Sequence, residues 1–205
     1  MPGKYNEHLI LASKSPRRQE LIRLLFNNVG QISASDEEPR WRSGEHPKDY
    51  LQACIDAKWR SALSQADPIS GGGGKASGLL VGDTIVVLGN DVLGKPDTPA
   101  EAKEMLGRLS GVEHEVWTGI RLGRRHGDKL RVRDSVVKSR VRFRPLAATE
   151  IERYVEIEKP FDKAGAYGFQ DRALLFVQSV KGSYSNIVGL PVEEVRRVAG
   201  ALKFV

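Results

Sequence analysis

Residues 9–22 read LILASKSPRRQELI and indicate how the chain folds, because an apolar run leads directly into a helix start. The run 9–12 is apolar throughout, which predicts a short buried strand. Ser15 followed by Pro16 suits the beginning of a helix, since serine is a favoured N-cap and proline fits the first helical turn. The apolar face of this helix is expected to comprise Leu21, Ile22, Leu24 and Leu25. A strand that continues into a helix is typical of α/β proteins.

The rest of the chain alternates in the same way. Strands are expected over 79–88, 113–122, 130–144 and 173–180, and helices over 47–65, 99–110, 149–157 and from 191 onward. Thr98 and Thr149 are each followed by a glutamate three residues later, which predicts a capping box at two of these helices. The second half of the strand 130–144 alternates apolar and basic residues, so one face is expected to be buried and the other cationic. Together these elements predict an α/β fold with a mixed β-sheet and flanking helices.

The segment 67–78 contains four consecutive glycines and no apolar periodicity, so it is expected to be a flexible surface loop. Its Gly74 and Lys75 resemble the end of a phosphate-binding loop. That motif requires a glycine where Ile69 stands and a hydroxyl where Ala76 stands. The segment is therefore interpreted as a linker within a single domain that spans residues 1–205.

Length and composition exclude several classes of protein. The chain has 205 residues, of which 40% are hydrophobic, enough to bury the core of one domain or of two packed lobes. No apolar run approaches the roughly 20 residues of a membrane helix. Residues 1–7 lack the apolar core of a signal peptide, so a cytoplasmic location is expected. A formal charge of +6 favours anionic partners, among which nucleotides, nucleic acid and acidic lipid remain open.

Two stretches carry side chains suited to phosphate and metal chemistry. Residues 13–18 place two serines and two arginines at a helix N-terminus, where unpaired N–H groups favour anions; an ordinary capped helix with solvated arginines is the alternative. Asp83 interrupts an apolar strand and needs a metal, a cation or backbone N–H groups as partner. Glu37 and Glu38 could add oxygen ligands, or could be solvated surface. Such an all-oxygen set favours Mg²⁺ or Mn²⁺ over zinc.

Two further segments contain glycines beside polar groups. Lys95 lies in a Gly-Lys-Pro turn, and the loop 162–170 reads DKAGAYGFQ. Glycines 165 and 168 would let the backbone approach a ligand closely. Tyr167 could stack on a nucleobase and Gln170 could hydrogen-bond to it, although the loop by itself is equally consistent with a plain turn.

Taken together, these segments resemble the Maf family of nucleoside triphosphate pyrophosphatases over nearly the whole chain. The matching stretches are LASKSPRRQEL (11–21), GDT (82–84), GKP (94–96), LSGVEHEVWTG (109–119), DKAGAYGFQ (162–170) and NIVGLP (186–191). The sequence departs from the family pattern at Gly82, Lys159 and Phe169 and in the glycine-rich insertion. None of these departures removes a residue to which the family assigns a catalytic role.

The resemblance implies a fold related to that of inosine triphosphate pyrophosphatases, with two lobes around a cleft, and commonly a homodimer. It implies hydrolysis of a nucleoside triphosphate to the monophosphate and pyrophosphate with a divalent cation, Mg²⁺ or Mn²⁺. The residue roles that it implies are catalysis by Asp83, Lys58 and Lys95, metal binding by Glu38 and Asp83, and substrate binding by Ser13, Arg17, Arg18, Thr84, Lys163, Tyr167 and Gln170. His114 is expected to be structural.

The resemblance also suggests a base preference. Thr84 and Gln170 are the residue types found in family members that act on dTTP and UTP. A neutral amide can donate to a pyrimidine carbonyl and accept from its N3–H, whereas a carboxylate suits guanine. We therefore expect dTTP, UTP and related modified pyrimidine nucleotides as substrates.

Two alternatives from other functional classes remain. The positive charge and the basic strand 130–144 are consistent with a nucleic-acid-binding module, but that strand lacks the interleaved aromatic residues that stack on single-stranded bases. A regulatory interaction protein that has kept the fold without catalysis is the second. We expect neither nucleic acid nor a membrane as the main partner.

Overall fold

A computed structural model describes residues 3–34, 39–65, 77–127 and 129–205. Its sheet has the order β2-β1-β3-β5-β6-β7, with the short β4 paired to β3. The strands are β1 (Tyr5–Ala12), β2 (Phe26–Ile32), β3 (Gly78–Leu88), β4 (Asp91–Leu93), β5 (Glu113–His126), β6 (Lys129–Phe143) and β7 (Val177–Lys181). β1 runs parallel to β2 and β3, whereas β3, β5, β6 and β7 pair antiparallel in succession. The predicted mixed sheet is confirmed.

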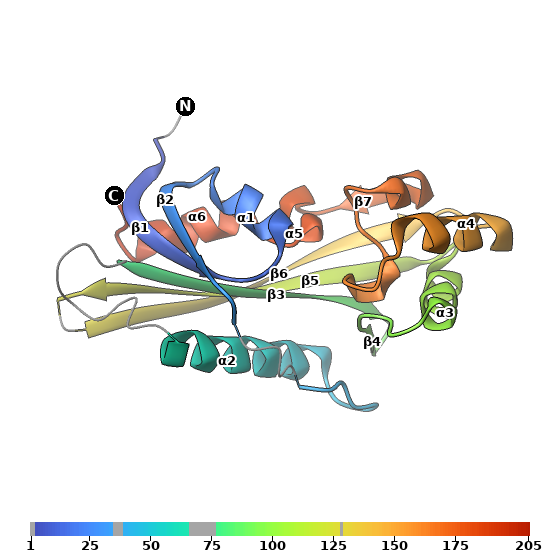
Figure 1. Ribbon diagram of the computed structural model, residues 1–205, viewed down its shortest axis with the longest axis horizontal. Coiled ribbons are helices and arrows are strands. Elements are labelled where there is room, and N and C mark those ends of the chain that lie inside the picture. Colours follow the sequence, from blue (N-terminus) through green and yellow to red (C-terminus); the bar gives the residue numbers. More distant parts are fainter. Residues whose placement is uncertain (1–2, 35–38, 66–76, 128) are drawn as a thin grey trace.

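Helices cover both faces of this sheet. They are α1 (Pro16–Ile22), α2 (Pro47–Gln65), α3 (Pro99–Leu109), α4 (Ala148–Glu158), α5 (Tyr184–Val188) and α6 (Val192–Ala201), with short 3₁₀ turns η1 (Ala164–Ala166) and η2 (Arg172–Phe176). Figure 1 shows α2 on one face of the sheet, α1, α5 and α6 on the other, and α3 and α4 toward one end.

The alternation of side chains in β1 and β3 explains this layering. Ile10 and Val81 point to one face, where they pack with Trp59 of α2. Leu11 and Leu80 point to the opposite face, in the cluster formed with α1 and α6. Because both faces are covered, β3 is apolar almost throughout, and a polar residue inside it is conspicuous.

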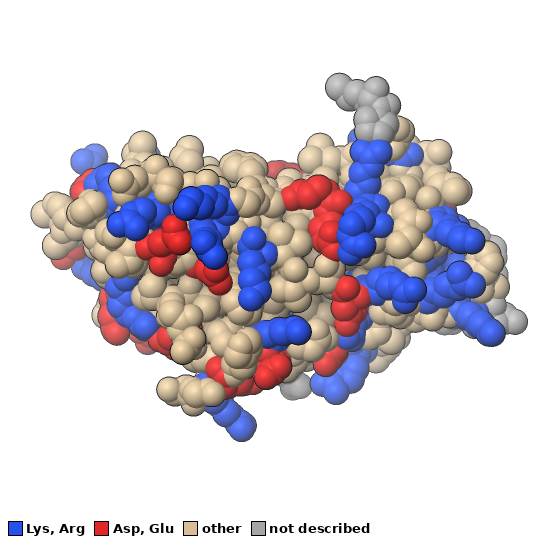
Figure 2. All heavy atoms as spheres, turned by 180° about the vertical axis from the view of Figure 1, so that it is seen from behind, with Lys and Arg blue, Asp and Glu red and all other residues tan. Residues whose placement is uncertain are grey.

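Several local predictions are confirmed. α2 has the expected bounds, 47–65. The Ser15 hydroxyl caps α1 by accepting from the Arg18 N–H at 3.4 Å, and the Thr98 hydroxyl caps α3 by accepting from the Glu101 N–H at 3.2 Å. In β6, Val141 and Phe143 are buried while the intervening basic residues are exposed. Figure 2 views the molecule from behind and shows basic side chains interspersed with acidic ones over the surface on that side.

The beginning of the chain differs from the prediction in two ways. α1 ends at Ile22, so Leu24 lies beyond it and is exposed rather than part of an apolar face. The chain then forms β2, which the sequence did not predict. β2 is an edge strand that includes two asparagines and a glycine, and its half-exposed pattern carries little hydrophobic periodicity.

Two predictions in the second half are wrong. Thr149 does not cap α4: the N-cap is Ala147, whose backbone N–H donates to the Glu150 carboxylate at 3.0 Å. The expected strand 173–180 is extended only from Val177, because the Asp171 carboxylate accepts from the Ala173 N–H and begins the 3₁₀ turn η2. Of the glycine-rich segment 67–78, which was expected to be a flexible loop, residues 67–76 lie outside the described residues, and its last residue, Gly78, begins β3.

None of the helices in the described part of the chain combines the length and the apolar character that a bilayer span requires.

Candidate active site

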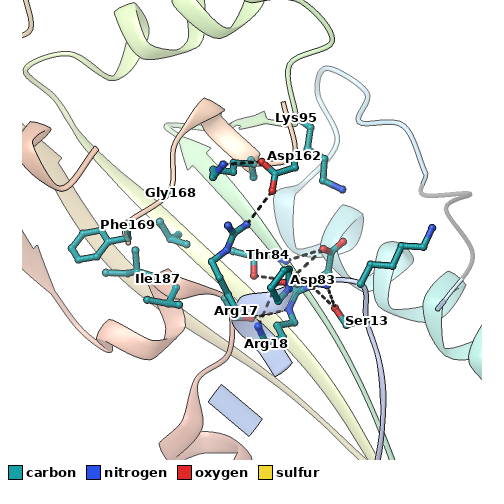
Figure 3. A pocket seen from close by; sticks show the side chains of 18 of the residues that line it. Ser13, Arg17, Arg18, Asp83, Thr84, Lys95, Asp162, Gly168, Phe169 and Ile187 are labelled. Carbon is teal, nitrogen blue, oxygen red and sulfur yellow. Dashed lines mark hydrogen bonds and ion pairs between the residues drawn. The ribbon is translucent and has the colours of Figure 1, made fainter. Parts of the chain in front are cut away.

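A cavity of about 280 Å³ opens where β1 ends and the chain turns into α1. One wall is formed by residues 12–18, the centre of β3 and Lys58 of α2. The facing wall is formed by residues 162–164, 167–169 and 187–189 (Figure 3). Within the described part of the chain, six basic side chains line it (Lys14, Arg17, Arg18, Lys58, Lys95 and Lys163) against two acidic ones (Asp83 and Asp162). The site is therefore suited to a multiply charged anion.

Asp83 is the buried carboxylate at the centre of this site. The period of two in β3 places Asp83 on the same face as Val81, toward α2, and from there the Lys58 ammonium contacts its Oδ1 at 2.9 Å. The Thr84 N–H donates to Oδ1 at 2.9 Å and the Arg18 guanidinium lies 3.8 Å away. Burial alone would raise the pKa of Asp83, but the charges of Lys58 and Arg18 outweigh it and hold the pKa below its ordinary value. Asp83 is therefore ionised at neutral pH.

Arg18 lines the cavity, but its donors are directed at protein oxygens. Its Nε donates to the Gly189 carbonyl at 2.8 Å, and its two terminal nitrogens donate to the Ser13 and Thr84 hydroxyls at 3.3 and 2.9 Å. Only about 10% of its side chain is exposed. These contacts give Arg18 a supporting position beside Asp83, which differs from the solvated arginine considered from the sequence.

Ser13 and Arg17 lie at the N-terminal end of α1. The Ser13 hydroxyl accepts from the Ser15 N–H at 3.2 Å as well as from Arg18, so the turn 13–15 closes on itself before the helix begins. Arg17 is more exposed than Arg18, and its guanidinium faces the Asp162 carboxylate at 3.7 Å. Figure 3 shows Arg17 pointing toward the cavity wall that carries Asp162.

The facing wall brings together the predicted Lys95 and Lys163. The Gly165 N–H donates to the Gly94 carbonyl at 2.9 Å, which ties the loop of Lys95 to the loop 162–170. Lys163 contacts Asp162 at 2.8 Å and Asp171 at 3.9 Å. Asp162, which the sequence did not single out, thus bridges Arg17 and Lys163; only its place in the matched loop motif could have indicated it.

Glycines 165 and 168 are required by packing within the protein. Gly165 has a φ of 68°, and a Cβ added there would lie 3.0 Å from Val86. A Cβ added to Gly168 would lie 2.3 Å from the Asp171 carboxylate. Both glycines thus lie close to other parts of the chain, and Gly168 also lines the cavity.

The structure places Tyr167 in the cavity lining and Gln170 outside it. The Tyr167 ring is buried edge-on against Phe143, and its hydroxyl bonds to His114 Nε2 at 2.8 Å. Only about 6% of Tyr167 is exposed, and it lines the cavity. Gln170 is exposed and does not line the cavity.

The burial of His114 is expected to make the fold sensitive to acid. Burial lowers the pKa of His114 to about 4, well below its ordinary value of 6.5. As the pH falls below 6.5, His114 becomes protonated in the unfolded chain but stays neutral in the folded protein. The free energy of unfolding therefore decreases over this pH range. His114→Gln should remove this component. Between pH 7.5 and 4.5 we expect the wild type to lose about 2–3 kcal/mol more than the variant in urea unfolding. Equal losses would contradict this prediction.

The described residues fit a divalent cation that is held jointly with a substrate. Among them, no group of three or more His, Cys, Asp or Glu side chains could hold a metal ion. Glu37 and the predicted metal ligand Glu38 lie outside the described residues. Mg²⁺ is commonly bound through one or two carboxylates together with substrate phosphates. Among the described residues that line the cavity, Asp83 and Asp162 are the carboxylates that could take this part.

Comparison with known proteins agrees with this geometry. A dTTP/UTP pyrophosphatase of Syntrophus aciditrophicus is 41% identical over 190 residues, which cover 92% of this chain and 87% of that protein. A dTTP/UTP pyrophosphatase of Hahella chejuensis is 43% identical over 195 residues, covering 94% of this chain and 90% of that protein. A family model described as Maf-like protein matches residues 8–202, almost the entire chain. The chain therefore belongs to the Maf-like protein family.

Proposed function

We propose that this protein is a nucleoside triphosphate pyrophosphatase that hydrolyses dTTP and UTP to the monophosphate and pyrophosphate. The observation that carries the proposal is the ionised Asp83 inside a cavity lined by six basic side chains of the described chain. The similarity to dTTP/UTP pyrophosphatases over more than 90% of the chain supports the choice of reaction and substrate.

The residues of the cavity divide into two roles in this proposal. Ser13, Arg17 and Lys163 bind the triphosphate, Arg17 exchanging its contact with Asp162 for phosphate oxygens. Asp83 aligns a water molecule and accepts its proton as the water attacks phosphorus. Lys58 and Lys95 neutralise the charge that develops on the leaving pyrophosphate. Arg18 and Thr84 contribute mainly by holding Asp83 in place, because their hydrogen bonds are made to protein oxygens.

A divalent cation, Mg²⁺ or Mn²⁺, completes the site. Asp83 and Glu38 would hold it together with the phosphate oxygens. When bound, it neutralises phosphate charge and makes phosphorus more susceptible to attack.

The nucleobase is assigned to the apolar end of the cavity. Figure 3 shows Phe169, Gly168 and Ile187 grouped there, away from Ser13. Phe169 is packed edge-on by Tyr184 at 5.5 Å, which holds its ring in place. We assign the contact with the base to this end and not to the ring of Tyr167.

Three broader properties belong to the same proposal. The two cavity walls correspond to two lobes, as in the inosine triphosphate pyrophosphatases that the family resembles. The protein acts as a homodimer, as is common in the family. It works in the cytoplasm on the free nucleotide pool.

The test is a panel of nucleoside triphosphates with Mg²⁺ or Mn²⁺ in which both products are identified. We expect the highest kcat/KM for dTTP and UTP, pyrophosphate as the product, and loss of turnover with a chelator. Diphosphate and orthophosphate as products would contradict the proposed reaction. Equal efficiency on 7-methyl-GTP and UTP would contradict the base preference alone. Absence of any turnover would favour a protein that has kept the fold without catalysis.

A further inference from the structure

A chain of hydrogen bonds connects the surroundings of Asp83 with helix α5 on the far side of the sheet. The Arg18 guanidinium donates to the Thr84 hydroxyl at 2.9 Å, and the Thr84 and Thr118 hydroxyls lie 3.0 Å apart. Thr118 then donates to the Asn186 carbonyl at 3.0 Å. Thr84 and Thr118 are directly paired in the antiparallel register of β3 and β5, so both point to the same face of the sheet.

The direction of each hydrogen bond in this series is determined by its two terminal groups, the Arg18 donor and the Asn186 carbonyl acceptor. A hydroxyl has one proton, and that of Thr118 is donated to the Asn186 carbonyl. Thr118 must therefore accept from Thr84, which has then used its own proton. The Thr84 oxygen is left with lone pairs only, and these face the Arg18 donor. Any change at Thr118 thus alters the oxygen to which Arg18 binds.

Thr118 and Asn186, at the end of the hydrogen-bond series away from Arg18, are held by buried contacts. Thr118 and Asn186 are both completely buried. The Asn186 amide donates to the Val116 carbonyl at 3.0 Å and to the Ser139 hydroxyl at 2.9 Å. Helix α5 also ends at Gly189, whose carbonyl accepts from Arg18 Nε at 2.8 Å. Arg18 is therefore held by α5 twice, directly through Gly189 and indirectly through Thr118 and Thr84.

We propose that Thr118 and Asn186 are positioning residues, which orient Arg18 through Thr84 so that its guanidinium stays beside Asp83. A valine at 118 would fill the same space without the cost of burying a hydroxyl, so packing alone does not account for the threonine. The inference rests on the proposed function for its kinetic consequence, but the orientation of Arg18 can be observed without any substrate.

The test compares Thr118→Val, which removes the acceptor with almost no change of shape, with Thr118→Ser, which keeps it. Misplacement of a group beside a reacting centre lowers the rate steeply, so we expect Thr118→Val to reduce kcat about tenfold or more. KM should change much less, since the residues proposed to bind the triphosphate are untouched. Thr118→Ser should restore most of the rate. If Thr118→Val does not fold, Thr118→Ala is measured in the same way.

Ser139→Ala provides the matched control. It removes one partner of the Asn186 amide, at 2.9 Å, while the bond of that amide to the Val116 carbonyl and the hydrogen bonds between Arg18, Thr84 and Thr118 remain. We expect it to lower stability in urea unfolding while kcat stays near that of the wild type. An equal fall of kcat in Ser139→Ala and Thr118→Val would show a general structural effect and overturn the proposal.

The second readout is the Nε–H proton of Arg18 in the ligand-free protein, identified by its absence in Arg18→Lys. In the wild type this proton is buried and bonded to Gly189, so its exchange with solvent should be slow. Thr118→Val should accelerate the exchange at least severalfold, and Ser139→Ala should not. Unchanged exchange in Thr118→Val, or a Thr118→Ser variant as impaired as Thr118→Val, would overturn the inference. A wild type without turnover would instead contradict the proposed function, while the exchange measurement would still decide the orientation of Arg18.

Discussion

Asp83→Asn is expected to reduce kcat by about 10²–10⁴-fold while triphosphate binding is retained or strengthened. The amide keeps the shape of the side chain but cannot accept a proton from water. It also removes the counter-charge of Lys58 and Arg18, which lie 2.9 and 3.8 Å from Oδ1 in the wild type. Two buried cations without a carboxylate lower the stability of the free protein and attract phosphate more strongly.

The measurement is single-turnover hydrolysis of UTP together with binding of a non-hydrolysable triphosphate. Thermal unfolding with and without pyrophosphate should show a larger stabilisation by the anion in Asp83→Asn than in the wild type. Asp91→Asn is the control, because Asp91 is also paired with an arginine, at 2.6 Å from Arg108, but lies outside the cavity lining. A variant at Asp83 that keeps more than a tenth of the wild-type rate would refute its assignment as the base.

Lys58→Met should reduce kcat/KM by about 10²–10³-fold, because a charge directed at the developing negative charge is lost. The side chain of Lys58 is only about 11% exposed, so water replaces its charge poorly. Its removal also changes Asp83: burial continues to raise the pKa of the carboxyl, while the larger of the two opposing charges is gone. Within the described part of the chain, Arg18 and the Thr84 N–H are then the groups that favour ionisation.

The sign of the resulting pH dependence follows from the need for ionised Asp83. A higher pKa means that Asp83 becomes protonated at a higher pH, so activity on the acid side should be lost at higher pH in Lys58→Met than in the wild type. Profiles of kcat/KM against pH measure this displacement. Lys58→Arg retains the charge and should keep the acid limb close to that of the wild type. If the acid limb of the kcat/KM profile of Lys58→Met lies at the same pH as that of the wild type, Lys58 does not control the ionisation of Asp83.

The sequence alone predicted the features that depend on neighbours along the chain. Helix α2, the Ser15 cap and the Thr98 cap follow from patterns that repeat within three or four residues. Asp83 was identifiable because a carboxylate within an apolar strand requires a partner. The family resemblance placed Lys58 among the catalytic residues, but only the structure shows it as the partner of Asp83, since a helix pattern does not tell which distant strand a lysine will meet.

The tertiary structure decided the features that depend on distant partners. Arg18 resembles a phosphate ligand in the sequence, but Thr84, 66 residues away, and Gly189, 171 residues away, accept its hydrogen bonds. The sequence suggested Tyr167 as a base-stacking residue, whereas in the structure its side chain is mostly buried and its hydroxyl bonds to His114 in the core. Thr118 and Asn186 are 68 residues apart, and their bond exists only because β5 and α5 pack together. A buried polar group must be satisfied, but which of many distant groups satisfies it is determined by how the sheet and helices pack, which local periodicity does not encode.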